Sequence, residues 1–247
     1  MWVQTLSDSC LDLLFPPRCA ICNGYLKVHG GKGICLACKG RVLPVEEPVC
    51  TSCGMEVYAK GSVTRVCGDC LRNIPPFEFA RSLFRYGDEI RVLVARLKYN
   101  KDTSVTAAIV DLVRECDLSL FNSCNYIVPV PLHKKRLQLR GFNQALLLAK
   151  ICFGRNDARI HSTLLRRTRN TAPQVSLSGI ERRRSLRNVF KVDTAIDISS
   201  STVCLVDDVY TTGTTVSECA KGLLRGGAGR VVVLTLARAE VPRRGRN

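Results

Sequence analysis

The sequence predicts an α/β fold in which a parallel sheet with flanking helices follows a small cysteine-rich module. The first observation is an alternation near the end of the chain. Apolar, β-branched strands at 202–206 and 230–237 enclose a helical pattern at about 215–225. Such alternation is typical of a parallel sheet covered on both faces. The second observation is that eight of the 14 cysteines form four C-x-x-C pairs within the first third.

Length and composition indicate two parts. The 247 residues, 46% hydrophobic and 23% charged, exclude a disordered or collagen-like chain and suffice for one core plus a smaller module. Pro75-Pro76 marks a stiff junction. We therefore expect an amphipathic N-terminal helix at 1–18, a double zinc ribbon at 19–75 and an α/β domain at 76–247.

The cellular compartment follows from apolar runs and cysteine chemistry. No apolar run approaches the length of a membrane span, and Asp8 and Asp12 interrupt the leucine-rich start. We expect no membrane span and a cytoplasmic protein. Thiols stay reduced there, so the cysteines are better explained as metal ligands than as disulfides.

The four pairs have matched spacing. Twelve residues separate the first two pairs and thirteen the last two, which is zinc-ribbon spacing twice over. A tight C-x-x-C turn points two thiolates at one ion, and a dozen residues let a hairpin bring the second pair round. We expect two structural zinc sites with the ligands Cys19, Cys22, Cys35, Cys38, Cys50, Cys53, Cys67 and Cys70.

The cysteine pattern leaves some alternatives open. A lone pair would also fit a redox dithiol or buried structural cysteines, but four pairs in two matched units favour zinc. Eight thiolates leave no open coordination position for a catalytic metal. Two successive ribbons and an interleaved arrangement both fit the spacing. Gly24, Gly54 and Gly68 follow cysteines closely and suit the positive φ of such turns.

Hydrophobic periodicity gives the remaining elements. The helix before the cysteine module ends at Pro16-Pro17. The scattered Cys204 and Cys219 lie in apolar patterns and are expected to be small core residues. After the junction we expect strands at 79–86 and 126–131, and helices at 90–97, 103–116 and 143–153.

The most informative segment is 206–215, which reads VDDVYTTGTT. It follows a predicted strand and opens a predicted helix, where open α/β sheets bind ligands. Free N–H groups and the helix dipole favour a phosphate there, and Gly213 allows close approach of the backbone. Asp207 and Asp208 would repel a phosphate but accept hydrogen bonds from hydroxyls, directly or through Mg²⁺. A ribose 5-phosphate carries both groups, whereas a solvated, capped turn would need neither the strand nor the acids.

These residues resemble a known family. Residues 206–215 resemble the phosphoribosyl diphosphate signature of type I phosphoribosyltransferases. Over nearly the whole chain, the sequence resembles the ComF/GntX family of DNA-uptake or DNA-utilisation proteins. The resemblance rests on the doubled ribbon, on 206–215, on the segments 128–132, 140–144 and 166–174, and on Arg182 with 188–190.

The resemblance implies a type I phosphoribosyltransferase-like domain at 76–247, which binds phosphoribosyl diphosphate or a related ribose 5-phosphate ligand with Mg²⁺. It implies that Asp207 and Asp208 hold the ribose hydroxyls. Pro131, Leu132 and His133 would form the diphosphate loop, and Arg140, Asn143 and Gln144 would line the same cleft. The implied 5-phosphate residues are Thr211, Thr212, Gly213, Thr214 and Thr215.

An enzyme of this kind would displace diphosphate at the anomeric carbon. Asp207, Asp208 and Arg140 are then the expected catalytic residues, with Arg140 or Lys134 neutralising the leaving group. His133 fits either proton transfer or an ordinary surface position. No hood for an acceptor base is identifiable, so the alternative is a non-catalytic phosphoribosyl-ligand sensor, or an accessory factor that binds single-stranded DNA for a helicase or translocation machine.

The net charge points to a polyanionic partner. Lys plus Arg number 37 and Asp plus Glu 21, so the formal charge is 37 − 21 = +16, concentrated at 165–188 and in the tail at 243–246. We expect single-stranded DNA, held through its backbone because aromatic residues make up only 6% of the chain. The zinc module would dock nucleic acid or a helicase or DNA-uptake partner. A purely structural zinc adaptor would have no use for the acidic pair and its threonines.

Overall fold

The computed structural model describes residues 16–26, 33–57, 65–99, 105–169 and 189–239. Contacts group the chain into two compact units, Met1–Leu43 with Gly87–Cys116 and Pro44–Tyr86 with Asp117–Asn247. Each unit contains one half of the doubled ribbon, and the two are described separately. The expected N-terminal helix, the arginines at 182–187 and the basic tail lie outside the described residues. The division at residues 18 and 75 remains a prediction.

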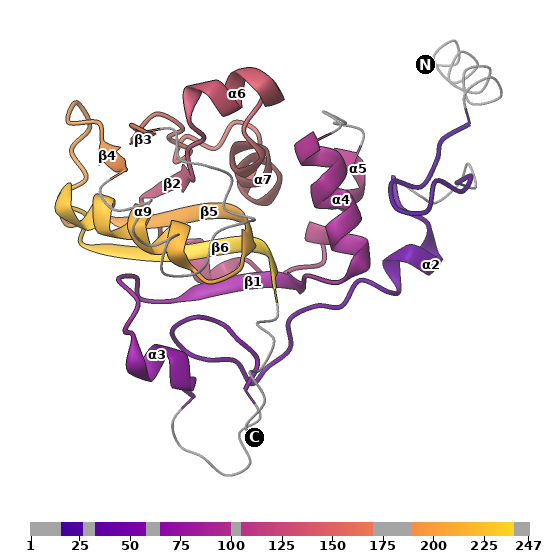
Figure 1. The fold of residues 1–247 in the computed structure, drawn as a ribbon, viewed down its shortest axis with the longest axis horizontal. Coiled ribbons are helices and arrows are strands. Elements are labelled where there is room, and N and C mark those ends of the chain that lie inside the picture. Colours follow the sequence, from indigo (N-terminus) through magenta and orange to yellow (C-terminus); the bar gives the residue numbers. More distant parts are fainter. Residues whose placement is uncertain (1–15, 27–32, 58–64, 100–104, 170–188, 240–247) are drawn as a thin grey trace. The chain divides into compact units, whose positions relative to one another are not determined.

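The larger unit is built on a parallel sheet, as the sequence predicts. Its four strands lie in the order β1-β6-β5-β2 (Figure 1) and are all parallel. Their bounds are Ala80–Arg85 for β1, Tyr126–Pro129 for β2, Thr202–Tyr210 for β5 and Arg230–Arg238 for β6. The two long strands, β5 and β6, form the centre of the sheet and contain its most continuous apolar runs.

Two helices cover opposite faces of β5, which is the α/β arrangement expected. The helices are α7, Gln144–Phe153, and α9, Thr214–Arg225. Cys204 interacts with Cys152 of α7, whereas Asp207, three residues further along the strand, interacts with Cys219 of α9. Side chains an odd number of residues apart on a strand point to opposite faces. Cys204 and Cys219 are fully buried, so their expected core positions are confirmed.

The strand that carries the acidic pair is longer than predicted. We expected it to end at Val206, but β5 continues to Tyr210. The reason is its partner, because Val209 pairs with Ala237 and Tyr210 with Arg238 at the end of β6. The acidic pair therefore lies within the last residues of the paired strand itself, and the predicted end of the strand at Val206 was wrong.

Smaller elements of this unit were not predicted. They are the short helix α3, Gly68–Arg72, the single-turn helix η1, Ser119–Phe121, the helix α6, Lys134–Arg140, and the antiparallel pair β3, Leu165–Arg167, with β4, Phe190–Val192. Helix α6 has no buried residue, so it leaves no hydrophobic period in the sequence. The strands β3 and β4 are three residues each, too short for a recognisable alternation.

The smaller unit combines the first ribbon with two helices, α4, Asp88–Tyr99, and α5, Val105–Val113. Both helices are those expected from periodicity. Arg96 of α4 donates a hydrogen bond to the carbonyl of Ala20 at 2.6 Å. Lys39, at the end of the short helix α2, Leu36–Lys39, forms an ion pair with Glu115 at 2.7 Å. The first ribbon is thus fastened to helices that lie well beyond it in the sequence.

Within the described ranges, no helix combines the length and the hydropathy needed to cross a membrane.

We predict that the close packing of the second ribbon on the sheet makes Gly54 irreplaceable. Gly54 has φ 71°, and a Cβ there would lie 2.5 Å from the carbonyl oxygen of Ala80. Gly141 has φ 81° with nothing within 4 Å of an added Cβ. Both alanine variants bear the left-handed strain, but G54A should lose about 1–3 kcal/mol more in denaturant unfolding, because backbone must move to accommodate it. Equal losses for G54A and G141A would show that packing contributes nothing.

Candidate metal centres and ligand loop

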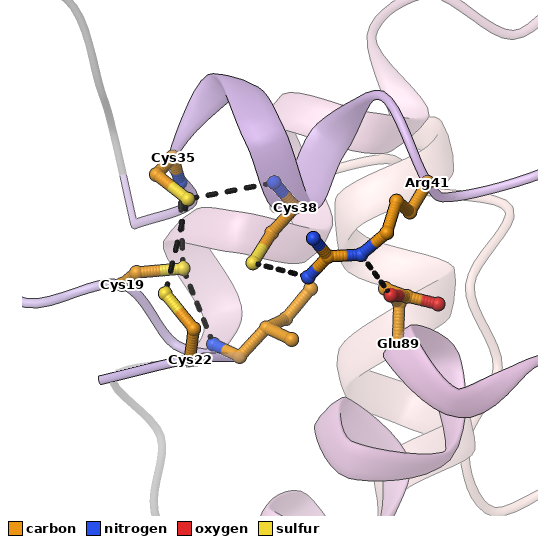
Figure 2. A network of polar contacts seen from close by, with 7 residues as sticks. Cys19, Cys22, Cys35, Cys38, Arg41 and Glu89 are labelled. Carbon is orange, nitrogen blue, oxygen red and sulfur yellow. Dashed lines mark hydrogen bonds and ion pairs between the residues drawn. The ribbon is translucent and has the colours of Figure 1, made fainter. Parts of the chain in front are cut away.

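The cysteines form two separate clusters, so the ribbons are successive rather than interleaved. One cluster contains Cys19, Cys22, Cys35 and Cys38, and the other Cys50, Cys53, Cys67 and Cys70. Within each cluster all four sulfurs lie within 4.8 Å of one another. Figure 2 shows the first cluster, in which the two pairs face each other across a common centre.

The sulfur geometry fits zinc. The Sγ atoms of Cys22 and Cys35 are 3.9 Å apart, and those of Cys53 and Cys67 are 3.7 Å apart. A tetrahedral ion with Zn–S bonds of about 2.3 Å separates its sulfurs by about 3.8 Å. Four thiolates without an open position are the ligand set of a structural site. The clusters therefore fit two structural zinc ions, as the spacing predicts.

The backbone of each ribbon stabilises a thiolate, the form that binds metal. Cys19 accepts N–H groups from Ile21 and Cys35 at 3.4 Å each, and Cys50 accepts those of Cys53 and Cys67 at 3.5 and 3.3 Å. Burial raises the pKa of Cys50, but the backbone donors outweigh burial and lower the pKa to about 7. The same balance lowers the pKa of Cys19 to about 6. In each cluster, one sulfur is thus stabilised as the thiolate, the form that binds a metal ion.

Only one of the three glycines expected to need a positive φ has one. Gly54 does, but the equivalent position in the first ribbon is Asn23, with φ 60°, one residue before Gly24. Asn tolerates this conformation better than other side chains do. Gly68 is instead the first residue of α3, where the backbone is helical. The expectation for Gly24 and Gly68 was wrong.

The two sites differ in exposure and in the arginine that contacts each. Cys22 is exposed and Cys35 half-buried, whereas all four sulfur ligands of the second cluster are buried. In the first, Nη2 of Arg41 donates to Sγ of Cys38 at 3.2 Å while Nε pairs with Glu89 at 2.6 Å (Figure 2). In the second, Nη2 of Arg238 donates to Sγ of Cys53 at 3.3 Å. Hydrogen bonds donated to a metal-binding sulfur in this way orient the ligand.

The acidic pair lies at the carboxyl end of β5, next to the start of α9. Asp207 and Asp208 are both half-buried, and the N–H of Asp208 donates to Oδ1 of Asp207 at 2.9 Å, which fixes that carboxylate. The chain then turns through Thr211 and Thr212 into Gly213, which has φ 70° and precedes α9 without a side-chain cap. Helix amides that lack a side-chain cap are open to an anion.

The threonines of this turn differ in their surroundings. The hydroxyls of Thr212 and Thr214 are 2.8 Å apart and hydrogen-bonded. Thr214 is buried, Thr211 and Thr212 are exposed, and Thr215 is half-buried in the first turn of α9. We define residues 207–215 as the ligand loop, because carboxylates, hydroxyls and helix amides come together within it.

The residues expected to form the diphosphate loop and to line the cleft beside it follow β2. Pro131 is buried and Leu132 half-buried. Asn143 caps α7 through the N–H of Ala145 and donates from Nδ2 to the carbonyl of Val130 at 3.1 Å, which fixes the start of α7 against the end of β2. The backbone N–H of Val130 bonds the carbonyl of Val206 at 2.8 Å, so this segment is anchored to the strand that carries the acidic pair.

Arg140 and His133 have defined local roles. Arg140 ends α6 and donates from Nη1 to Oε1 of Gln144 at 3.2 Å. Nε2 of the buried Gln144 has no hydrogen-bond partner within the part of the chain that the structure describes. His133 caps α6, its Nδ1 accepting the N–H of Lys135 at 3.3 Å. A capping histidine of this kind fits the surface alternative.

One cation beside the acidic pair was predicted only as part of an arginine-rich stretch. Arg167 of β3 interacts electrostatically with Asp207 and with Arg136 of α6. Burial lowers the pKa of Arg167, the like charge of Arg136 lowers it further, and Asp207 raises it. Positive charge from two elements therefore gathers beside the acidic pair. Two buried neighbours of the turn, Tyr210 and Phe77, gave no functional signal in the sequence.

Comparisons with known proteins agree with this arrangement. The double zinc ribbon domain model matches residues 10–71. The chain is 32% identical over 234 residues to DNA utilization protein YhgH of Escherichia coli O157:H7, covering 92% of this chain and 99% of that protein. It is 31% identical to Competence protein F of Haemophilus influenzae, with 90% and 97% covered, and 30% identical to Competence protein ComFC of Bacillus subtilis, with 83% and 84% covered. This chain belongs to the ComF/GntX family. Both metal clusters and the ligand loop thus occur in a ComF/GntX protein.

We predict that a chelator removes zinc from this ComF/GntX protein in two steps of one equivalent each. The first cluster should release its ion faster, because Cys22 is exposed, and the second more slowly, because its four ligands are buried. Absorbance of a chromogenic chelator follows both steps. C22S should abolish the fast step and C53S the slow one. The reverse assignment, or a single step in the unaltered protein, would contradict this order.

Proposed function

We propose that this protein binds phosphoribosyl diphosphate with Mg²⁺ at the ligand loop and acts in DNA uptake or utilisation. Its zinc module would serve as the docking site for nucleic acid or for a protein partner. The observation that carries the ligand proposal is the sequence of groups along one strand and turn. Two half-buried carboxylates, Asp207 and Asp208, are followed by hydroxyls and by uncapped helix amides. A ribose with a 5-phosphate needs these groups in this order.

The proposed roles follow from the chemistry of each group. Asp207 and Asp208 accept hydrogen bonds from the ribose hydroxyls, and their carboxylate oxygens are suitable ligands for a hydrated Mg²⁺. The amides at the start of α9, with the hydroxyls of Thr212 and Thr214, hold the 5-phosphate. Mg²⁺ would neutralise diphosphate charge when bound. Arg140 and Lys134 come from the helix after the expected diphosphate loop and would stabilise the leaving group.

We predict that D207N and D208N each weaken phosphoribosyl diphosphate binding by about 10- to 100-fold, the cost of losing a charged hydrogen-bond acceptor. G213A should weaken it without any change of charge, because an added Cβ would lie 2.6 Å from Cζ of Tyr210. Titration calorimetry with and without Mg²⁺ measures both effects.

The matched control is D88N, at a side chain that is 83% exposed at the start of α4. It removes the same charge and should leave affinity unchanged. Release of diphosphate from the bound ligand separates the two functional classes. An enzyme releases it and loses this activity in D207N, whereas a sensor binds the ligand without turnover. Undiminished binding by D207N and D208N would refute the ligand assignment.

The DNA part of the proposal is supported by charge and by relatives. The chain carries a net charge of +16, and relatives aligned over most of its length are named DNA utilization and competence proteins. Among the described cations several are paired, such as Arg91 with Asp88 and Arg159 with Asp157. The dense arginine run at 182–187 is therefore the segment we assign to the phosphates of single-stranded DNA.

We predict that this run sets the salt dependence of binding to single-stranded DNA. Neutralising Arg182, Arg183, Arg184 and Arg187 to Gln should lower the slope of log K against log salt by about 3, since each phosphate contact contributes about 0.7. Fluorescence anisotropy with a labelled oligonucleotide measures the slope. The control removes equal charge at four exposed positions elsewhere, Arg91, Arg114, Arg155 and Arg225. An equal change in both variants would reduce the effect to net charge alone.

A further inference from the structure

A single arginine connects the second metal centre to the end of β5. Arg238 is the last residue of β6, and its guanidinium makes two contacts with Cys53. Nη1 donates to the backbone carbonyl at 2.5 Å, and Nη2 donates to Sγ at 3.3 Å. The plane of the guanidinium lies over the ring of Tyr210, with Cζ of Arg238 4.4 Å from the ring centroid. Because Arg238 pairs with Tyr210 in the sheet register, these two side chains are adjacent by construction.

Tyr210 in turn packs against the turn of the ligand loop. The side chain is 7% exposed and belongs to the core that contains the second cysteine cluster. Its ring meets Phe77 edge-on, at 6.5 Å between centroids and 88° between planes. A Cβ added to Gly213 would lie closest to the hydroxyl oxygen of Tyr210 and 2.6 Å from Cζ, so this side chain and the turn are in close contact. The ring therefore leaves the turn no room to move inward.

The first metal centre lacks this connection. Arg41 makes the equivalent contact with Cys38, but its other partner is Glu89 of α4 (Figure 2). Both partners belong to the smaller unit, whereas the ligand loop belongs to the larger one. The chain thus provides two arginines that each donate a hydrogen bond to a cysteine sulfur of one cluster, and of these two Arg238 contacts Tyr210, the residue that packs on Gly213.

We propose that Arg238 and Tyr210 are positioning residues through which zinc at the second centre holds the ligand loop in its binding conformation. A bound ion fixes the turn that carries Cys53, Cys53 holds Arg238, and Arg238 holds the ring against Gly213. Since coupling between two sites is reciprocal, a phosphorylated ligand at the loop should slow the loss of the second zinc ion. This last consequence rests on the proposed function, but the effect of zinc on the loop does not.

The test compares R238M with R41M in the full zinc-loaded chain. Each should weaken zinc binding at one site by about 10- to 100-fold in chelator competition, because each removes a hydrogen bond to a metal-binding sulfur. Only R238M should increase hydrogen exchange at the amides of 211–215, measured by mass spectrometry. It should also weaken binding of phosphoribosyl diphosphate with Mg²⁺ by about 5- to 150-fold, the usual range of site coupling. R41M should leave the loop and the ligand affinity unchanged.

Two variants of Tyr210 guard against a merely structural explanation. Y210L removes the ring but keeps both contacts of Arg238 with Cys53. It should therefore expose 211–215 to exchange, while its zinc affinity equals that of the unaltered protein. Y210F keeps the ring and should restore protection. If R238M weakens zinc binding but leaves exchange at 211–215 unchanged, the coupling is overturned. If the unaltered protein fails to bind phosphoribosyl diphosphate, only the proposed function falls, because the exchange comparison needs no ligand.

Discussion

The burial of four thiolates in one hydrophobic core is the constraint on which the larger unit depends. Cys50, Cys53, Cys67 and Cys70 are each at most 6% exposed and lie in the same cluster as central sheet residues such as Val233. Uncompensated negative charge in such surroundings costs many kcal/mol, whereas zinc accepts all four sulfurs at once. An ion bound there would therefore stabilise this core together with the ribbon. The sheet contacts the second ribbon through β1, where Ala80 donates to the carbonyl of Ser52, and through Arg238 of β6.

The first ribbon belongs to the other unit, and its cysteine cluster is less completely buried. Its site is partly open at Cys22, and its contacts within the unit include the ion pair of Lys39 with Glu115 and the close approach of Gly33 to the backbone of Ala108 in α5. The Glu115 side chain is 69% exposed, and exposed ion pairs contribute little to stability. The first site is therefore accessible at Cys22, whereas the second lies within the core of the larger unit.

The features that could be predicted from sequence are those whose causes are local. Cysteine spacing encodes a tetrahedral site within some twenty residues, and β5, β6 and α9 carry long periodic patterns, so these were predicted correctly. The last four residues of β5 were missed because their pairing partner, the end of β6, supplies the reason. The contact between Cys53 and Arg238 joins residues 185 positions apart, and no local pattern marks it. Helix α6 was missed because none of its residues is buried, so it leaves no hydrophobic period. The residues of the ligand loop were predicted as a motif, but the packing of Arg238 on Tyr210 and of Tyr210 on Gly213 was not.

The charges beside the acidic pair bear on which ligand the proposed site would accept. Arg167 is a half-buried cation that Arg136 repels, while Cys219 and Asp207 offset that repulsion. A ligand that gave its hydroxyls to the acids and its phosphates to the cations would satisfy both sets of charges. A free phosphate would meet the repulsion of Asp207 and Asp208 with nothing to offer them. If the proposed function holds, this arrangement would favour a sugar phosphate over a simple anion, because β5 continues to Tyr210 and holds the acids in its ladder.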